Sequence, residues 1–318
     1  MKPFFTYFIL PFTFVLSEAV AQDDDTSITV NRKNSEHPEE SFFQLAEQYR
    51  TGDGVVQNYE AAFRLYKESA NLDYTPAIHA LGGCYIKGLG TTINIEEGIR
   101  LLTVSANRGY IKSIHGLVSF YETGIPGYLQ PDISKAKSWL KKGYELGDLV
   151  CMGSYGWYLL NPRFTPEPRV HEGLKLLSSA AEQGSSGAQY RLAVLYSHGL
   201  YVEQSDATAF YWYSLSAAQG NHEAQKELAL CYNIGRGTVA NYERAVEIFQ
   251  KLALLGDVDC QYWLGCCLVE GRGISKDVEQ GIEWLKKAEK NGHELAGQLI
   301  REVQQDMEFI QKIFLEAN

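Results

Sequence analysis

One motif recurs seven times along this chain, and its fixed spacing limits the folds that are possible. In each copy a small residue is followed by leucine or tyrosine at the fourth position after it. Most copies then carry glycine or alanine at the fifth position and tyrosine at the eighth. The copies start at Ser41, Ala77, Ser113, Cys151, Ala188, Ala224 and Cys260, which are 36 to 38 residues apart. A repeat of this length indicates a solenoid, in which each unit buries its apolar face only against its neighbours.

Each period predicts two helices. Offsets 0, +4, +5 and +8 lie on one face of a helix with 3.6 residues per turn, and a Gly-x-Gly sequence then ends that helix. A second apolar stripe follows and predicts the second helix. In it a small residue is followed by a bulky residue three positions later and by a glycine eleven positions later, as in Ala136, Trp139 and Gly147. The small residues let neighbouring helices approach closely. The sequence thus predicts an all-α fold, a right-handed alpha-alpha superhelix of seven helix pairs over residues 41–294.

The two ends of the chain differ from the repeats. Residues 1–21 resemble a secretory leader, because Lys2 precedes a short apolar stretch that ends in the small residues Ala19 and Ala21, and cleavage is expected after Ala21. Residues 22–40 are polar and read as a disordered spacer. Residues 295–318 carry one apolar helical face and are expected to cap the last repeat.

Composition narrows the possible partners. The chain has 318 residues and a formal net charge of −10, which disfavours nucleic acid as a partner because phosphate binding needs a basic face. No stretch reaches the roughly 18 apolar residues of a membrane span, so no transmembrane segment is expected after leader cleavage. The expected location is the periplasm or the extracellular space, and the expected state is a monomer.

The frame A-x-x-x-L-G-x-x-Y-x-x-G-x-G, followed by A-x-x-W-x-x-x-A-A-x-x-G, resembles the Sel1-like repeat, a relative of the tetratricopeptide repeat. A tetratricopeptide array has a period of about 34 residues and lacks the Gly-x-Gly loop. The resemblance covers residues 41–294 and implies a scaffold that binds a protein or peptide. Exported members of the family serve as adaptors in envelope signalling, envelope assembly or host contact.

Two copies depart from the pattern. The third inserts Ile125 and Pro126 within the loop 124–131, and the fourth replaces its glycines with the proline-rich loop 161–168. One interpretation is tolerated loop variation, and the other is a kink or partner-binding loop in the middle of the array.

No common catalytic frame accompanies the repeats. Three His-Glu pairs occur, but Lys175, Lys226 and Gly297 stand where a metalloprotease needs its second histidine. A phosphate loop and a nucleophile elbow are also absent. The sequence therefore predicts a protein that is not an enzyme and uses no cofactor or metal. Two alternatives stay open: a cell-wall-active enzyme, as some cysteine-rich relatives have been assigned, and a structural subunit of an envelope complex.

The six cysteines are expected to be buried small apolar residues without disulfides. They are Cys84, Cys151, Cys231, Cys260, Cys266 and Cys267. Cys231 and Cys267 have the same offset in adjacent repeats, so they lie about one repeat apart, beyond the roughly 7 Å between Cα atoms that a disulfide spans. Cysteine-rich relatives pair a cysteine late in a second helix with one that opens the next helix. At the first of these positions this chain has Tyr144 and Ala253.

If the first helix of each pair lines a concave groove, as in a tetratricopeptide array, offsets +2, +3, +6 and +9 face the partner. The residues at these offsets are rich in tyrosine, tryptophan and arginine, which dominate interface hot spots. Aromatic residues at these offsets also serve packing in repeat proteins, so both roles stay open. The candidate binding residues are His79, His115, Glu122, Trp157, Tyr190, Arg191, Lys226, Glu227, Asn233, Tyr262 and Trp263.

Overall fold

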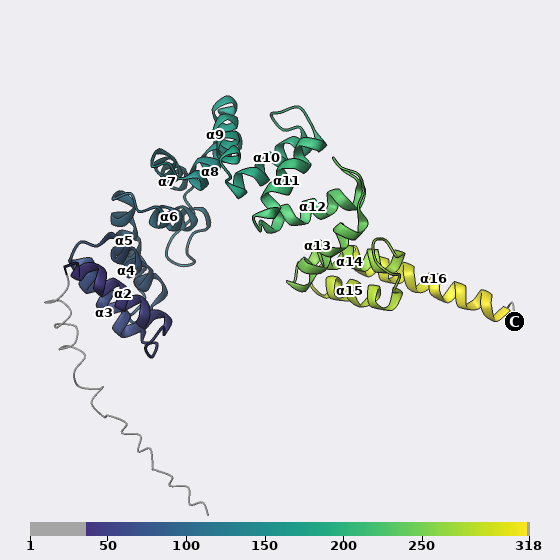
Figure 1. Cartoon of the computed structure of the whole chain (residues 1–318), viewed down its shortest axis with the longest axis horizontal. Coiled ribbons are helices and arrows are strands. Elements are labelled where there is room, and N and C mark those ends of the chain that lie inside the picture. Colours follow the sequence, from purple (N-terminus) through teal and green to yellow (C-terminus); the bar gives the residue numbers. More distant parts are fainter. Residues whose placement is uncertain (1–35, 317–318) are drawn as a thin grey trace, which may run out of the picture. The chain divides into compact units, whose positions relative to one another are not determined.

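The structure of the protein, a computed structural model, describes residues 36–316 and consists of helices joined by short loops (Figure 1). The expected leader, its cleavage site and most of the spacer lie outside the described residues. Within residues 36–316, seven helix pairs precede a last helix, which confirms the predicted all-α array of paired helices. The pairs are α2(Pro38–Thr51) with α3(Tyr59–Asn71), α4(Thr75–Lys87) with α5(Ile95–Asn107), α6(Ile111–Thr123) with α7(Ile133–Glu145), α8(Leu149–Leu160) with α9(Val170–Glu182), α10(Ser186–His198) with α11(Asp206–Ala218), α12(His222–Ile234) with α13(Tyr242–Leu254), and α14(Val258–Glu270) with α15(Val278–Lys290). The last helix is α16(Ala296–Glu316).

The chain divides into two compact units, one ending at Leu117 and the other beginning at Val118, and each is described by itself. In the first unit α3 packs on both α2 and α4, and α5 packs on α4. In the second unit each helix from α7 to α15 packs on the one that follows it. The apolar cores hold the residues that carry the repeat, such as Leu81 and Cys84 in the first unit and Ala245 and Leu264 in the second.

Gly-x-Gly ends the first helix of a pair, as predicted, and its two glycines have different roles. The first takes the left-handed conformation that closes the helix, with φ of +68° at Gly88 and +71° at Gly235. The second lies against the backbone of the preceding pair. A Cβ at Gly237 would be 2.1 Å from the carbonyl oxygen of Asp206, and one at Gly273 would be 2.3 Å from that of Tyr242. Only glycine allows this approach.

Small residues also bring the two helices of one pair together, as the sequence predicts. Gly82 of α4 faces Gly98 of α5, and a Cβ on either would lie within 3.0 Å of the other residue's carbonyl oxygen. Gly265 and Gly281 repeat this arrangement between α14 and α15. The backbones therefore touch where the helices cross.

Short polar residues start most of the second helices. Asn58, Asn94 and Asn241 each accept a hydrogen bond from the backbone N–H three residues later, and Asp132 does the same for α7. Such caps satisfy a backbone donor that the helix itself leaves unpaired. They fix where each second helix begins.

The irregular segments differ in part from expectation. Helix α2 begins at Pro38, within the last residues of the expected spacer 22–40, and proline is favoured in the first turn of a helix. The loop 161–168 packs on α8: the ring of Phe164 stacks on Tyr158 at 4.4 Å, and the Thr165 hydroxyl donates to the Tyr158 carbonyl at 2.7 Å. The loop 124–131 closes with a single bridge between Ile125 and Leu129.

Helix α16 packs on α15 through its first turns, where Ala296, Ile300 and Val303 are buried. Its later turns extend past the last pair in Figure 1, and Met307 and Ile310 on the same helical face are exposed. The expected capping role therefore belongs to the first half of the helix.

Candidate functional site

A cavity of about 410 Å³ opens in the first unit on the side formed by the first helices of the pairs, here called the first-helix face. We call it the first-repeat cavity. Its walls come mainly from α2 and α4. The start of α6 and the side chain of Tyr66 from α3 complete the lining. The cavity is lined by Phe43, Glu47, Arg50, Tyr66, Pro76, His79, Ala80, Gly83, Cys84, Lys87, Leu89, Tyr110 and Lys112.

The cavity exists because the second repeat has small residues where other repeats have large ones. Ala80 and Gly83 stand at offsets +3 and +6, and a Cβ at Gly83 would meet no atom within 4 Å. The fifth repeat has Arg191 at +3, and the fourth has Trp157 at +6. The missing side-chain volume leaves the wall open to solvent.

The carboxylate in the cavity wall is already paired. Arg50 donates to Glu47 through Nε at 3.2 Å and Nη2 at 2.6 Å, and the Tyr66 hydroxyl donates to the same carboxylate. Burial opposes ionisation of Glu47, but these donors outweigh it and lower its pKa. Burial and the adjacent carboxylate also raise the pKa of Tyr66, so the phenol stays protonated and keeps donating.

Two lysines at the cavity have no such partner. Lys87 and Lys112 are exposed, and no carboxylate of the described chain forms an ion pair with either. The charge of Lys112 reaches into the cavity, because it contributes to lowering the pKa of both Glu47 and His79. Burial is the larger cause at His79, whose imidazole is therefore neutral near pH 7.

The pair of His79 with Ser113 does not form a catalytic site. Nδ1 of His79 and Oγ of Ser113 are 2.9 Å apart, the separation expected of a base and its nucleophile. Ser113 is completely buried, however, and its hydroxyl donates to Ser105 at 2.9 Å. Nearby, burial raises the pKa of the Cys84 thiol to about 11, so it is protonated at neutral pH. These groups stabilise the wall of the cavity, and the arrangement can bind but not attack a substrate.

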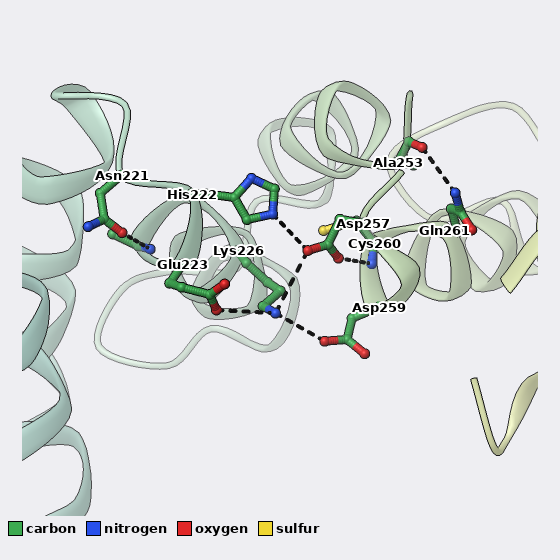
Figure 2. A network of polar contacts seen from close by, with 10 residues as sticks. Asn221, His222, Glu223, Lys226, Ala253, Asp257, Asp259, Cys260 and Gln261 are labelled. Carbon is green, nitrogen blue, oxygen red and sulfur yellow. Dashed lines mark hydrogen bonds and ion pairs between the residues drawn. The ribbon is translucent and has the colours of Figure 1, made fainter. Parts of the chain in front are cut away.

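Candidate residues in the second unit mostly connect one repeat to the next. Lys226 pairs with Asp259 at 3.1 Å and with Asp257 at 3.8 Å, both at the start of the following pair (Figure 2). The ring of Tyr262 stacks on His293 at 4.1 Å. Contacts of this kind explain polar and aromatic residues at offset +2 without a ligand.

The remaining candidates lie in several different environments. Arg191 donates to Ser154 at 2.9 Å and lies over the ring of Trp157, and its burial lowers its pKa. Glu122 accepts a hydrogen bond from Tyr158. Glu227 pairs with Arg236, the ring of Tyr190 lies near Tyr213, and Trp263 stacks on Phe249.

Two candidates are less accessible than expected of a binding residue. Asn233 is 2% exposed and therefore unavailable at the surface, and His115 is half-buried in α6.

The residues that α2 contributes to the first-repeat cavity are absent from the sequence candidates, because the offsets were not applied to the first repeat. Counted from Ser41, offsets +2, +6 and +9 are Phe43, Glu47 and Arg50, and all three line the first-repeat cavity. The signal was present in the sequence. Lys87 and Lys112 carry no such offset and become visible only in the structure.

Asp257 contacts three residues of the network in Figure 2 and so joins α12 to α14. One oxygen accepts from the backbone N–H of Cys260 at 2.8 Å and so caps α14, and the other lies 2.8 Å from Nε2 of His222. Burial favours the neutral acid, but these bonds and the charge of Lys226 outweigh it and lower the pKa of Asp257. The ionised form therefore stabilises the folded state.

We expect Asp257→Asn to lower the free energy of unfolding by about 1–3 kcal/mol at pH 7, because the cap remains while the charge is lost. The folded pKa lies below the unfolded value of about 3.9, so this contribution is complete above that pH and disappears as the pH falls through the folded pKa. Urea unfolding between pH 3 and 7 measures the difference. Asp277→Asn is the control, since Asp277 caps α15 in the same way. Equal losses for the two variants would show that the network contributes nothing.

The six cysteines are all buried, in agreement with their predicted role as small apolar core residues. Burial raises the pKa of Cys267 to about 11 and that of Cys266 to about 12. Only about one thiol in a thousand would be ionised at pH 8 with a pKa near 11.

We therefore expect a disulfide-exchange reagent to label almost no thiol of the native protein at pH 8. All six thiols should react in guanidinium without reductant. Rapid labelling of the native chain would contradict the burial. Fewer than six thiols in the denatured chain would reveal a disulfide and contradict the sequence expectation.

Two Ser-x-x-K frames lie in α7, Ser134 with Lys137 and Ser138 with Lys141. Such a frame supplies the nucleophile of penicillin-binding enzymes. Here Nζ of Lys137 donates to Thr165 at 2.7 Å and Lys141 pairs with Glu145 at 3.6 Å. In the described structure neither lysine hydrogen-bonds its serine, so the frames do not form an activated nucleophile.

The stacked helix pairs and their glycine turns define an α-solenoid of the interaction-scaffold class. The Sel1 repeat model matches residues 43–74, 75–110, 115–148, 165–185, 186–221, 222–257 and 258–293. The chain therefore belongs to the Sel1 repeat family. The short fourth match begins within the loop 161–168, where the glycines are missing. Sel1 repeat proteins are generally non-catalytic scaffolds that bind other proteins.

Among the solved structures that share the fold are two Sel1-type repeat proteins. One is a protective antigen present in uropathogenic Escherichia coli strains with an SLR fold: it is 24% identical, with a TM-score of 0.72 over 87% of this chain and 58% of that one. This chain thus spans less than two thirds of that structure. The other is a Sel1 repeat protein from Oxalobacter formigenes, 23% identical, with a TM-score of 0.71 over 88% of this chain and 81% of that one. No curated protein matches the chain. Among the described helices, none is both long and apolar enough to cross a membrane.

Proposed function

We propose that this protein is an exported, non-catalytic adaptor that holds a protein or peptide partner on its first-helix face. The family supports the scaffold role, and residues 1–21 support export to the periplasm or the cell exterior. The pathways that fit such an adaptor are envelope signalling, envelope assembly and host interaction.

The first-repeat cavity is the observation that carries this proposal. Along the second unit, polar groups of the first-helix face pair with one another, as Lys226 does with Asp259 and Glu227 with Arg236. At the cavity, by contrast, an apolar wall and two unpaired lysines face solvent. A concave, partly apolar site with a few polar groups is the usual form of a binding site.

Photo-crosslinking in the native cell tests where the partner docks. A photo-reactive amino acid replaces Pro76, which lines the cavity without contributing a charge, or, as the control, Lys251, which is exposed on α13. We expect a specific adduct from position 76 and none from position 251. Adducts only from position 251 would move the binding surface away from the cavity, and no specific adduct from either position would count against the adaptor role.

Export has its own test. The amino-terminal sequence of the protein recovered from envelope and secreted fractions should begin at Gln22, the residue after the expected cleavage site. A chain that keeps Met1 and stays in the cytoplasmic fraction would disprove export and leave the binding role untouched.

A further inference from the structure

We propose that the first-repeat cavity selects its partner by a carboxylate, taken from an acidic peptide segment that carries an apolar side chain beside the acid. This inference rests on the proposed adaptor function and adds the chemistry of the ligand. It follows from the charges at the cavity, from its apolar wall and from the charge of the whole chain.

The charges at the cavity favour an anion. Three cations line it, Arg50, Lys87 and Lys112, against one carboxylate, Glu47. Glu47 is occupied by Arg50 and Tyr66, so its lone pairs are not free for a ligand's cation. Lys87 and Lys112 have no carboxylate partner in the described chain, and each can donate to an incoming carboxylate.

The two lysines come from different helices of the cavity wall. Lys87 ends α4, where a helix terminus already favours a cation, and Lys112 lies in the first turn of α6. Both line the same cavity. Each ammonium group therefore offers donors to a carboxylate that a ligand brings into the cavity.

An apolar wall lies beside the cations. Phe43 and Tyr110 contribute aromatic rings, and Leu89 and Ala80 add aliphatic surface. The Tyr110 ring is held by the neutral imidazole of His79 at 5.2 Å, and Phe43 by Tyr66 at 5.8 Å. An aromatic or large aliphatic side chain next to the acid would bury its surface here.

The rest of the molecule argues against a polyanion as the ligand. The chain has a net charge of −10, which disfavours binding of a nucleic acid. One or two carboxylates on an extended peptide match a positive site of limited size. The acid could be a side chain or the carboxyl terminus of the partner, and both share the same chemistry.

Selection from a random dodecapeptide library against the full chain tests the inference. We expect peptides rich in aspartate or glutamate next to aromatic or aliphatic residues. The selected peptides are then synthesised with the acids changed to amides, and separately with an amidated carboxyl terminus, to distinguish the two sources of carboxylate. Loss of the essential carboxylate should weaken binding about ten- to hundredfold, the usual range for a charge-assisted hydrogen bond.

Variants locate the site. Lys87→Glu combined with Lys112→Glu should weaken binding at least about tenfold, whereas Lys251→Glu combined with Lys286→Glu changes the net charge equally at exposed lysines of the second unit and should leave binding unchanged. Gly83→Leu fills the cavity and should also abolish binding, and Gly83→Ala, which adds one methyl group in open space, should not. Thermal unfolding of each variant confirms that the fold persists.

The outcomes separate this inference from the function on which it rests. Selected peptides without acids, or acidic peptides that bind the charge-reversed variant equally well, would overturn the cavity's proposed selectivity while the adaptor role stands. A library that yields no binder to the wild-type chain would count against peptide binding itself and overturn both. Equal weakening by both lysine pairs would show that only the overall charge matters, and would also overturn the proposed site.

Discussion

Replacing Gly90 with alanine is expected to lower the free energy of unfolding by about 3–5 kcal/mol, a loss found only where a mutation forces groups to overlap or leaves a cavity. The added Cβ would lie 1.9 Å from the carbonyl oxygen of Tyr59 and 2.4 Å from its carbonyl carbon. Both obstacles belong to the backbone at the start of α3, so no side-chain rotation relieves the overlap. The two helix pairs would have to separate.

Gly54→Ala is the matched control. Gly54 is the second glycine of the first repeat and has φ of +73°, close to the +70° of Gly90. No atom lies within 4 Å of a Cβ at Gly54, because no described helix pair precedes α2. Gly54→Ala should therefore lower the free energy of unfolding by only about 1–2 kcal/mol, because alanine disfavours the left-handed conformation. Chemical denaturation of both variants gives the comparison, and equal losses would show that the approach of Tyr59 does not constrain the fold.

The Gly-x-Gly loop shows what the sequence could and could not predict about the fold. The first glycine was predictable from local chemistry, because a left-handed residue ends a helix. The second glycine recurs for a reason outside its own loop, the backbone of the pair before it. Its recurrence at a fixed offset marked it as important, but only the packing of successive pairs explains it.

The binding face was less predictable than the fold. Helical offsets give the direction of a side chain, so they placed Lys226 and Tyr262 toward the first-helix face. They do not tell whether the next repeat already occupies that side chain, as Asp259 and His293 do here. The first-repeat cavity arises from missing volume at Ala80 and Gly83. A cavity forms only where several helices pack together, so no pattern of residues along one helix predicts it.

Phe249→Ala should destabilise the second unit by about 3–5 kcal/mol, the usual cost of removing a buried aromatic ring. The ring of Phe249 is fully buried and stacks on Trp263 at 6.3 Å, so it joins α13 to α14. A repeat array is stabilised mainly by contacts between neighbours, and the loss should therefore act locally. Amide exchange should speed up most in α13 to α15 and least in α8 and α9.

Phe309→Ala gives the matched control for the same change of residue. Phe309 is 65% exposed on α16, and its loss should change the free energy of unfolding by no more than about 0.5 kcal/mol. If Phe249→Ala instead speeds exchange equally from α8 to α15, the second unit unfolds as one cooperative block. A confined response would mean that each helix pair depends on its immediate neighbours, so that a partner bound at one pair stabilises mainly the pairs beside it.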